Sequence, residues 1–157
     1  MSVDFKTFVS LAPSVSAARL PVLLRGRHGI GKSQVVYQLA ANASLPVVER
    51  RASQMTEGDL VGLPSVEGNR TTFNPPDWFK QACDEPVLLF LDEVDRATAE
   101  VRQGICELTD SRKLNGHVLH PLSAYVQMRG VVMPKSWSVN NSCPPTTKNK
   151  ILKINKK

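Results

Sequence analysis

Eight consecutive residues near the start of the chain have the types and spacing of a phosphate-binding loop. They match the pattern G-x-x-x-x-G-K-[ST] and are, in order, Gly26, Arg27, His28, Gly29, Ile30, Gly31, Lys32 and Ser33. The glycines let the backbone curl so that successive N–H groups point at one anion, and a following helix adds the partial positive charge of its N-terminus. We expect Lys32 to reach the β- and γ-phosphates of a nucleotide and Ser33 to ligate Mg²⁺. The predicted nucleotide-binding set is these eight residues and Gln34.

The segments on either side of this loop have the character that such a loop requires. An apolar run, Pro21–Leu24, precedes it, and a pattern typical of a helix, Gln34–Ala41, follows it. Strand, loop and helix in this order are the context in which the motif binds phosphate. The alternative interpretation is a glycine-rich turn before a helix, and the loop alone leaves that alternative open.

A second pair of residues suited to chemistry follows an apolar segment. Residues 87–91 are all apolar, as in a parallel strand covered on both faces, and Asp92 and Glu93 come directly after them. Open α/β sheets place their ligands at this end of their strands. We expect Asp92 to hold Mg²⁺ together with Ser33, and Glu93 to orient and deprotonate the water that attacks the γ-phosphate. Glu93 and Lys32 are thus the predicted catalytic residues, and a pair of acids that only caps a helix is the competing interpretation.

Residues 15–121 resemble the AAA+ ATPases, and specifically the MoxR-like group that is related to the dynein-type AAA modules. Four segments carry the resemblance: GRHGIGKS, TEGDLVGLP, FNPPDWFKQA and LFLDEVDRA. The last segment is close to the group's motif D-E-[IV]-N-R-A, with Asp95 in place of the usual Asn. The resemblance implies an α/β fold, a three-layer P-loop NTPase sandwich with a mostly parallel sheet. It also implies ATP and Mg²⁺ as cofactors, ATP hydrolysis coupled to the remodelling of partner proteins, and assembly into a homo-oligomeric ring.

The same resemblance assigns two hairpins to the neighbourhood of the ring's central pore. The first is predicted at residues 66–73 with its turn at Gly68-Asn69, and the second at residues 113–118 with its turn at Asn115-Gly116. Arg96 matches the arginine of the group's motif, which implies a place near the nucleotide or at a subunit contact. A local ion pair at the surface is an equally open interpretation of Arg96.

Apolar patterns predict the remaining elements of this core. Strands are expected at Val22–Leu24 and Leu45–Arg50, and an amphipathic helix is expected around Val101–Leu108. Thr56 is a predicted helix N-cap. A short N-terminal helix is predicted to be interrupted at Pro13.

The pattern changes after Pro121, and we predict a partial P-loop core over residues 1–121 and a basic, low-pattern tail over residues 122–157. Residues 1–110 carry 11 Lys and Arg against 14 Asp and Glu, whereas residues 111–157 carry nine Lys and Arg and no acid. A mildly acidic core argues against a general nucleic-acid-binding protein, although the tail could contact phosphates electrostatically. A solvated or disordered tail is the alternative.

The family's fourth strand, polar sensor residue, arginine finger and helical lid are not recognisable after Pro121, although residues 125–133 have some strand character. The fold is therefore predicted to be incomplete at its C-terminus, as a truncation or an out-of-frame reading would make it. A second hypothesis follows, namely a non-hydrolysing nucleotide-binding or interaction fragment. A P-loop kinase or a nucleic-acid translocase is disfavoured, because phosphate-facing lid arginines and a basic core are lacking.

The composition favours a cytoplasmic protein with no membrane contact. The sequence has no apolar run of about 18 residues, and its N-terminus lacks the pattern of a signal peptide. The cysteines, Cys83, Cys106 and Cys143, are widely spaced and predict free thiols in a reducing compartment. We expect a protein substrate whose identity no motif in the sequence specifies.

Overall fold

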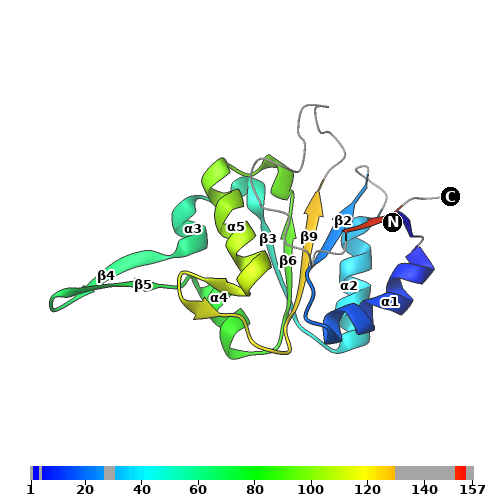
Figure 1. Ribbon diagram of the computed structural model, residues 1–157, viewed down its shortest axis with the longest axis horizontal. Helices are drawn as coiled ribbons and strands as arrows, with labels where there is room; N and C mark the ends of the chain where they lie inside the picture. Colours follow the sequence, from blue (N-terminus) through cyan, green and yellow to red (C-terminus); the bar gives the residue numbers. More distant parts are fainter. Residues whose placement is uncertain (1, 4, 27–30, 130–150, 155–157) are drawn as a thin grey trace.

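The computed structural model describes residues 2–3, 5–26, 31–129 and 151–154 of the 157 in the chain. Within them, six strands form one sheet in the spatial order β1-β10-β2-β9-β6-β3 (Figure 1). Their bounds are Ser2–Val3 (β1), Val22–Arg25 (β2), Val47–Arg51 (β3), Leu88–Asp92 (β6), Ala124–Arg129 (β9) and Ile151–Ile154 (β10). All neighbouring strands in this sheet run parallel, so their carboxyl ends meet at one edge. The α/β fold with a mostly parallel sheet is confirmed.

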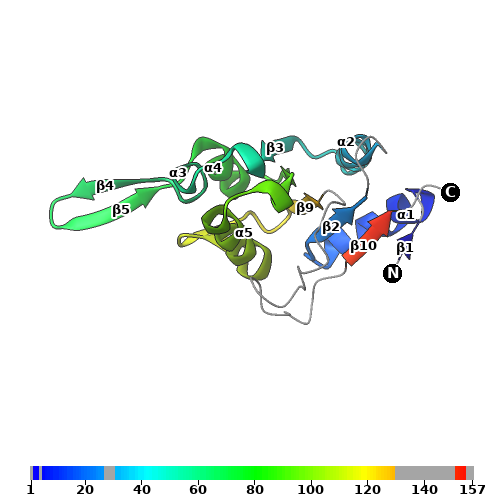
Figure 2. The ribbon, with the colours of Figure 1, turned by 90° about the horizontal axis from the view of Figure 1, so that it is seen from above.

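Helices cover both faces of the sheet and make it the middle of three layers (Figure 2). Their bounds are Phe5–Ala17 (α1), Lys32–Ala43 (α2), Glu57–Val61 (α3), Asp77–Asp84 (α4) and Ala99–Ser111 (α5), with 3₁₀ turns at Ala52–Gln54 (η1) and Val94–Arg96 (η2). Strand β6 packs against helices on both faces of the sheet, because successive side chains along a strand point to opposite faces. Leu88 and Phe90 pack with α1 and α2, whereas Leu89 and Leu91 pack with α3, α4 and α5. Burial on both faces explains why this strand is apolar without alternation.

Local side-chain chemistry sets the start of α3 and joins it to α4. Thr56 Oγ1 accepts a hydrogen bond from the Asp59 N–H at 3.3 Å, and Asp59 Oδ2 accepts one from the Thr56 N–H at 2.9 Å. This reciprocal pair is a capping box, so the predicted N-cap is confirmed. Trp78 in α4 donates its indole N–H to the Asp59 carbonyl oxygen at 3.0 Å and packs edge-on against Phe79. Both rings are buried, and they join α4 to the core.

The predicted interruption of the first helix at Pro13 is wrong. Helix α1 runs through Pro13 and ends at Ala17. A proline inside a helix costs about 3 kcal/mol, because it removes one N–H and clashes with the preceding turn. Phe8, Ala12 and Val15 on the same helix are buried against the sheet, and each large apolar side chain so buried contributes about 1.5–3 kcal/mol. Tertiary packing therefore outweighs the local cost.

Residues 122–157, set apart in the sequence as a low-pattern tail, supply two strands of the sheet. Strand β9 lies between β2 and β6, and β10 lies between β1 and β2. In β9, Tyr125 and Val126 pack into the two opposite cores. Gln127 is also buried, and its amide Nε2 donates to the Tyr125 hydroxyl at 2.7 Å and to Thr109 Oγ1 in α5. The strand character noted at residues 125–133 thus corresponds in part to a strand of the sheet, Ala124–Arg129. The sequence pattern alone was weak here because Gln127 is a buried polar residue whose partners lie elsewhere in the fold.

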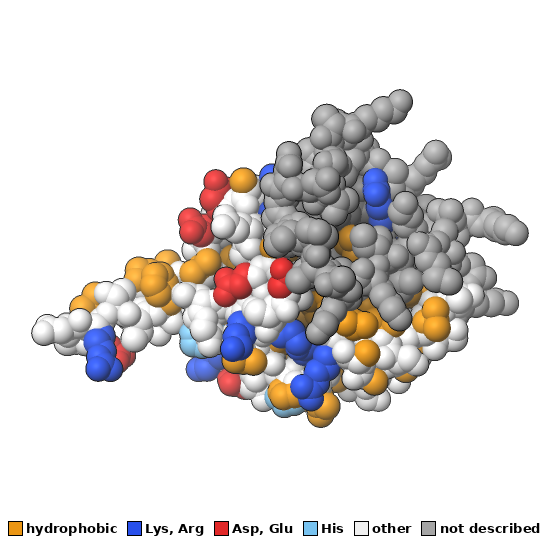
Figure 3. Space-filling view, in the orientation of Figure 1, with side chains coloured by type: hydrophobic (Ala, Val, Ile, Leu, Met, Phe, Trp, Pro, Cys, Tyr) orange, Lys and Arg blue, Asp and Glu red, His pale blue; other side chains and the backbone are white. Residues whose placement is uncertain are grey.

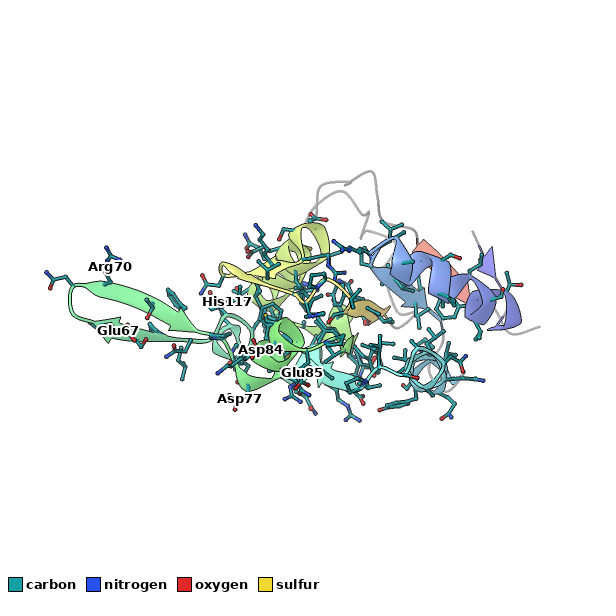
Figure 4. The ribbon with its side chains drawn as sticks, turned by 90° about the horizontal axis from the view of Figure 1, so that it is seen from below. Glu67, Arg70, Asp77, Asp84, Glu85 and His117 are labelled. Carbon is teal, nitrogen blue, oxygen red and sulfur yellow. The ribbon has the colours of Figure 1, made fainter. Side chains whose placement is uncertain are left out.

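Two antiparallel ribbons leave this body at the places that the sequence predicts. They consist of β4 (Leu63–Glu67) with β5 (Arg70–Asn74), and β7 (Lys113–Leu114) with β8 (His117–Val118). Figures 1 and 2 show that the β4–β5 ribbon projects away from the three layers. Figure 4 shows Glu67 and Arg70 at its far end and His117 near its base. His117 Nε2 donates to the Phe73 carbonyl oxygen at 3.2 Å, so the short ribbon supports the base of the long one.

The two faces of the β4–β5 ribbon differ in polarity. Ser65 and Thr72 lie opposite each other with their hydroxyls 2.9 Å apart. The other face carries Pro64 opposite Phe73 and Val66 opposite Thr71, and Val66 is 74% exposed. Figure 3 shows hydrophobic side chains gathered along this projection. The ribbon therefore presents an apolar surface that nothing within the described chain covers.

None of the helices in the described part of the chain combines the length and apolar character needed to cross a membrane. Cys83 is a free thiol, as predicted, while Cys143 lies outside the described residues. Burial raises the pKa of Cys83 to about 11, with a smaller contribution from the charge of Asp84. The thiol form of Cys83 therefore predominates at neutral pH.

Gly62 should be the least replaceable glycine at the base of the long ribbon. Its φ is 91°, and a Cβ there would lie 1.9 Å from the Asn74 carbonyl oxygen. We expect Gly62→Ala to lower the free energy of unfolding by about 2–4 kcal/mol, through backbone strain plus a steric clash. Gly68→Ala is the matched control, because its φ is 61° and no atom lies within 4 Å of the added Cβ. Urea denaturation that finds equal losses for the two variants would contradict this account.

Candidate functional site

The predicted phosphate-binding loop connects the central strand β2 to helix α2. Gly26 follows β2 and is buried, and Gly31 precedes α2 with φ 84°, in the left-handed region that glycine adopts without strain. The N-cap residue of α2 is Gly31, which makes no side-chain capping hydrogen bond, and the N–H groups of a helix's first turn have no partners within the helix and can bind an anion. Residues 27–30, which include the predicted binding residues Arg27, His28, Gly29 and Ile30, lie outside the described residues, so their roles stay predictions.

Lys32 lies at the first position of α2, and its side chain folds back across the start of the loop. Lys32 Nζ donates to the Gly26 carbonyl oxygen at 3.0 Å. Its positive charge also acts on Asp92, where it partly offsets the rise in the pKa of that carboxyl group. Ser33 is half-buried at the second position of the helix, whereas Gln34 is exposed. The ammonium group and the hydroxyl therefore lie at the same helix end, as the motif predicts.

Asp92 ends β6 and points to the face of the sheet that α2 covers. Its neighbours two and four residues earlier, Phe90 and Leu88, pack on that face, and side chains alternate along a strand. The Glu93 N–H donates to Asp92 Oδ1 at 2.7 Å. Burial raises the pKa of Asp92 and is the largest contribution. The hydrogen bond from the Glu93 N–H lowers this pKa, the negative charge of Glu93 raises it, and the positive charge of Lys32 lowers it. A half-buried carboxylate with a serine hydroxyl at the facing helix end is a donor set of hard oxygens, which suits Mg²⁺.

Glu93 holds an unusual backbone conformation just past the end of β6. Its φ is 52° and its ψ is 36°, a left-handed conformation that costs a non-glycine residue about 1–2 kcal/mol. It precedes η2, and its own side chain makes no capping hydrogen bond there. Glu93 Oε2 instead accepts a hydrogen bond from Ser53 Oγ at 2.6 Å. Strain of this kind is typical of functional positions.

Arg96 forms an ion pair with Glu93, with 3.7 Å between Arg96 Nη1 and Glu93 Oε1. The arginine side chain is 58% exposed, so the pair contributes little to stability. The local ion pair that the sequence left open is therefore present. The other interpretation, a contact with nucleotide or a neighbouring subunit, concerns molecules that are not part of this chain.

Sequence reasoning missed Ser53 and a second contact near the site, between Tyr37 and Glu49. Ser53 follows β3, the neighbour of β6, and the Tyr37 hydroxyl on α2 donates to Glu49 Oε2 on β3. That hydrogen bond is the main cause of the raised pKa of Tyr37, and burial adds to it. No motif contains these residues, and their relevance follows from β3 lying next to β6.

A cavity of about 290 Å³ lies at the opposite end of the sheet. It opens among the first residues of β2, β6 and β9, beneath α1 and α2, and its lining is mainly apolar. Because the predicted phosphate-binding and acidic residues are at the other end of these strands, this cavity is separate from the candidate site.

Comparison with known proteins gives consistent matches. A family model for the AAA domain of the dynein-related subfamily matches residues 21–127. The chain is 30% identical over 107 residues to protein NorQ of Paracoccus denitrificans, covering 68% of this chain and 39% of NorQ. It is 34% identical over 101 residues to protein CbbQ of Hydrogenophilus thermoluteolus, covering 62% of this chain and 37% of CbbQ. The chain thus spans about two fifths of the length of these relatives.

Among solved structures, a putative ATPase from Cytophaga hutchinsonii superposes with a TM-score of 0.65. The superposition covers 99% of this chain and 47% of that one, at 15% sequence identity. At this identity the likeness concerns the fold alone, and it agrees with the three layers described above.

In the absence of metal and nucleotide, the free energy of unfolding should depend on the charge of the half-buried Asp92 carboxyl group. Because its pKa is raised in the folded state, ionisation costs stability as the pH rises through that pKa. Asp92→Asn, which can still accept the Glu93 N–H, should therefore be more stable than the parent at pH 7.5. The gain should shrink as the pH falls and vanish below the ordinary value of 3.8.

Urea unfolding in EDTA at pH 7.5 and at pH 4 measures this difference. Glu67→Gln, at the exposed far end of the ribbon, is the control and should change little. A gain for Asp92→Asn that is the same at both pH values would show that the burial of the charge is not its cause.

Proposed function

This chain belongs to the AAA+ ATPases of the dynein-related, MoxR-like group, and on that premise we propose that it binds ATP with Mg²⁺ and hydrolyses it. In the intact family such hydrolysis serves the remodelling of partner proteins, and we extend that role to this chain as part of the proposal. The chain is shorter than its relatives, so a partner protein and assembly into a ring are proposed from family membership alone.

The observation that carries the proposal is the meeting of two residue pairs at one edge of the sheet. Lys32 and Ser33 begin the helix after β2, while Asp92 ends β6 and Glu93 follows it directly. Only β9 separates these two strands. Adjacent strands lie about 4.8 Å apart, so β2 and β6 are about 10 Å apart, a distance that the phosphates of a nucleotide can bridge. The electrostatic interaction of Lys32 with Asp92 supports their closeness.

Each residue then has a defined task in hydrolysis. Backbone N–H groups of the loop and Lys32 bind the β- and γ-phosphates, and Ser33 and Asp92 hold Mg²⁺. The bound Mg²⁺ supplies neutralisation of phosphate charge. Glu93 takes a proton from the attacking water as the new bond from oxygen to γ-phosphorus forms and the bond to the bridging oxygen breaks. Ser53, which donates to Glu93 Oε2, holds the carboxylate in a defined orientation.

Assembly into a homo-oligomeric ring and contact with a protein substrate complete the proposal. The β4–β5 ribbon, with its exposed Val66 and Phe73, and the β7–β8 ribbon are the surfaces that family resemblance assigns to a central pore. A nucleic-acid substrate is not proposed, because residues 1–110 carry more acids than bases.

Lys32→Ala should abolish nucleotide binding. A ligand at 100 times its Kd stabilises the folded state by about 2.7 kcal/mol, which raises the midpoint of thermal unfolding of a domain this size by about 5–10 °C. We expect this rise with Mg-ATP for the parent chain and for Lys80→Ala, an exposed lysine on α4, and no rise for Lys32→Ala. A variant without Lys32 that keeps the full shift would refute the assigned loop.

Glu93→Gln should bind Mg-ATP with unchanged affinity and hydrolyse it about 10²–10⁴-fold more slowly, because the amide cannot take the proton. Phosphate release measured at several protein concentrations gives the turnover, and Glu100→Gln on α5 serves as the matched control. Unchanged turnover in Glu93→Gln would remove Glu93 as the base. Binding by the parent chain with no phosphate release at any concentration would favour the non-hydrolysing alternative.

A further inference from the structure

Tyr37, in the middle of α2, connects this helix to β3, the edge strand of the sheet. It lies four residues after Ser33, so the two side chains share one face of the helix, one turn apart. The Tyr37 hydroxyl donates to Glu49 Oε2 on β3. This bond brings a third carboxylate to the side of the sheet where Ser33 lies, and no motif in the sequence includes that carboxylate.

Glu49 and Asp92 lie on neighbouring strands and point to the same face. In β3, Val47 packs with α1 and α2, and the alternation of side chains gives Glu49 that same direction. The register pairs Glu49 with Phe90 and Arg51 with Asp92, so the two carboxylates are one strand apart and offset by two residues. The charge of Glu49 is close enough to contribute to the raised pKa of Asp92, after burial and the contacts of Glu93 and Lys32.

Two arguments indicate a role for Glu49 beyond joining α2 to β3. Tyr37 is 43% exposed, and a hydrogen bond between side chains at the surface contributes only about 1 kcal/mol or less. Glu49, one strand away from Asp92 and offset by two residues, also adds to the negative charge around that carboxylate, and a divalent cation would relieve this repulsion. Mg²⁺ in proteins keeps several of its waters, and these need hydrogen-bond acceptors.

Building on the proposed function, we propose that Glu49, held by Tyr37, is a positioning residue of the Mg²⁺–nucleotide site that accepts hydrogen bonds from water bound to the metal. Asp92 and Ser33 would hold the metal, and Glu49 would orient its bound water from the edge strand. Outer groups of this kind typically change metal affinity by about 10–100-fold when they are lost. Glu49 therefore sets how much Mg²⁺ the site needs.

The experiment is a Mg²⁺ titration of the binding of a non-hydrolysable fluorescent ATP analogue to the full chain. Glu49→Gln keeps the shape of the side chain and an oxygen that accepts from Tyr37, but loses the negative charge. We expect its midpoint for Mg²⁺ to rise about 10–100-fold, with analogue binding in EDTA unchanged or tighter. Glu67→Gln, far out on the ribbon, should match the parent chain.

Tyr37→Phe is the second variant, and it removes only the hydroxyl. It should raise the Mg²⁺ midpoint in the same direction by a smaller factor, and it should add nothing to the shift already present in Glu49→Gln. An unchanged midpoint in Glu49→Gln, or independent effects of the two substitutions, would overturn the inference. So would a loss confined to the thermal unfolding midpoint without ligand, because that is the result of a purely structural link.

Failure of the proposed function gives a different result. In that case the parent chain binds no analogue, or binds it without any response to Mg²⁺. If the parent chain binds with a clear Mg²⁺ response and only the effect of Glu49→Gln is missing, the proposed function stands and the role of Glu49 is refuted.

Discussion

The parallel pairing of β9 with both β2 and β6 is the constraint on which the candidate site depends. It sets the distance between the loop that follows β2 and the acids that end β6, and it directs both toward one edge of the sheet. Strand β9 in turn depends on burial: Tyr125 and Val126 fill opposite cores, and Gln127 is satisfied by Thr109 and Tyr125. A defect in β9 would therefore separate the two halves of the site without touching either motif.

The start of β9 is itself secured by polar contacts at the other end of the sheet. Arg112, which ends α5, donates to the carbonyl oxygens of His120 and Ser123 at 3.0 and 2.8 Å. Ser123 Oγ accepts from the Val87 N–H at 3.0 Å, just before β6. In the segment between β8 and β9, Pro121 and Leu122 are exposed while Leu119 and Ser123 are buried, and these contacts satisfy the carbonyl groups at its partly buried ends. Contacts at the amino ends of β6 and β9 therefore help to hold the strands whose other ends carry the candidate site.

The acidic side of the site combines several energetic costs, which Lys32 and the Glu93 N–H offset in part. Asp92 is a half-buried carboxylate with Glu93 and Glu49 near it, and Glu93 has a strained backbone. Ser53, Tyr37 and Arg96 hold the two glutamates through single contacts from three separate elements. Carboxylates held in defined orientations are consistent with the proposed Mg²⁺ site. The exposed ribbon of β4 and β5 lies outside this arrangement and presents a separate surface.

The sequence by itself determined the features that depend on neighbours along the chain. It predicted the loop from Gly26 to Ser33, the acids after β6, both ribbons and the capping residue Thr56, because each needs only a few adjacent residues to form. It did not reveal the helix through Pro13, strand β9, or the roles of Ser53, Tyr37 and Glu49. Those depend on partners far away in the sequence: the core beneath α1, the amide contacts of Gln127, and the adjacency of β3 to β6. Only the tertiary structure decided them, because burial and strand order are properties of the assembled sheet and of no single segment.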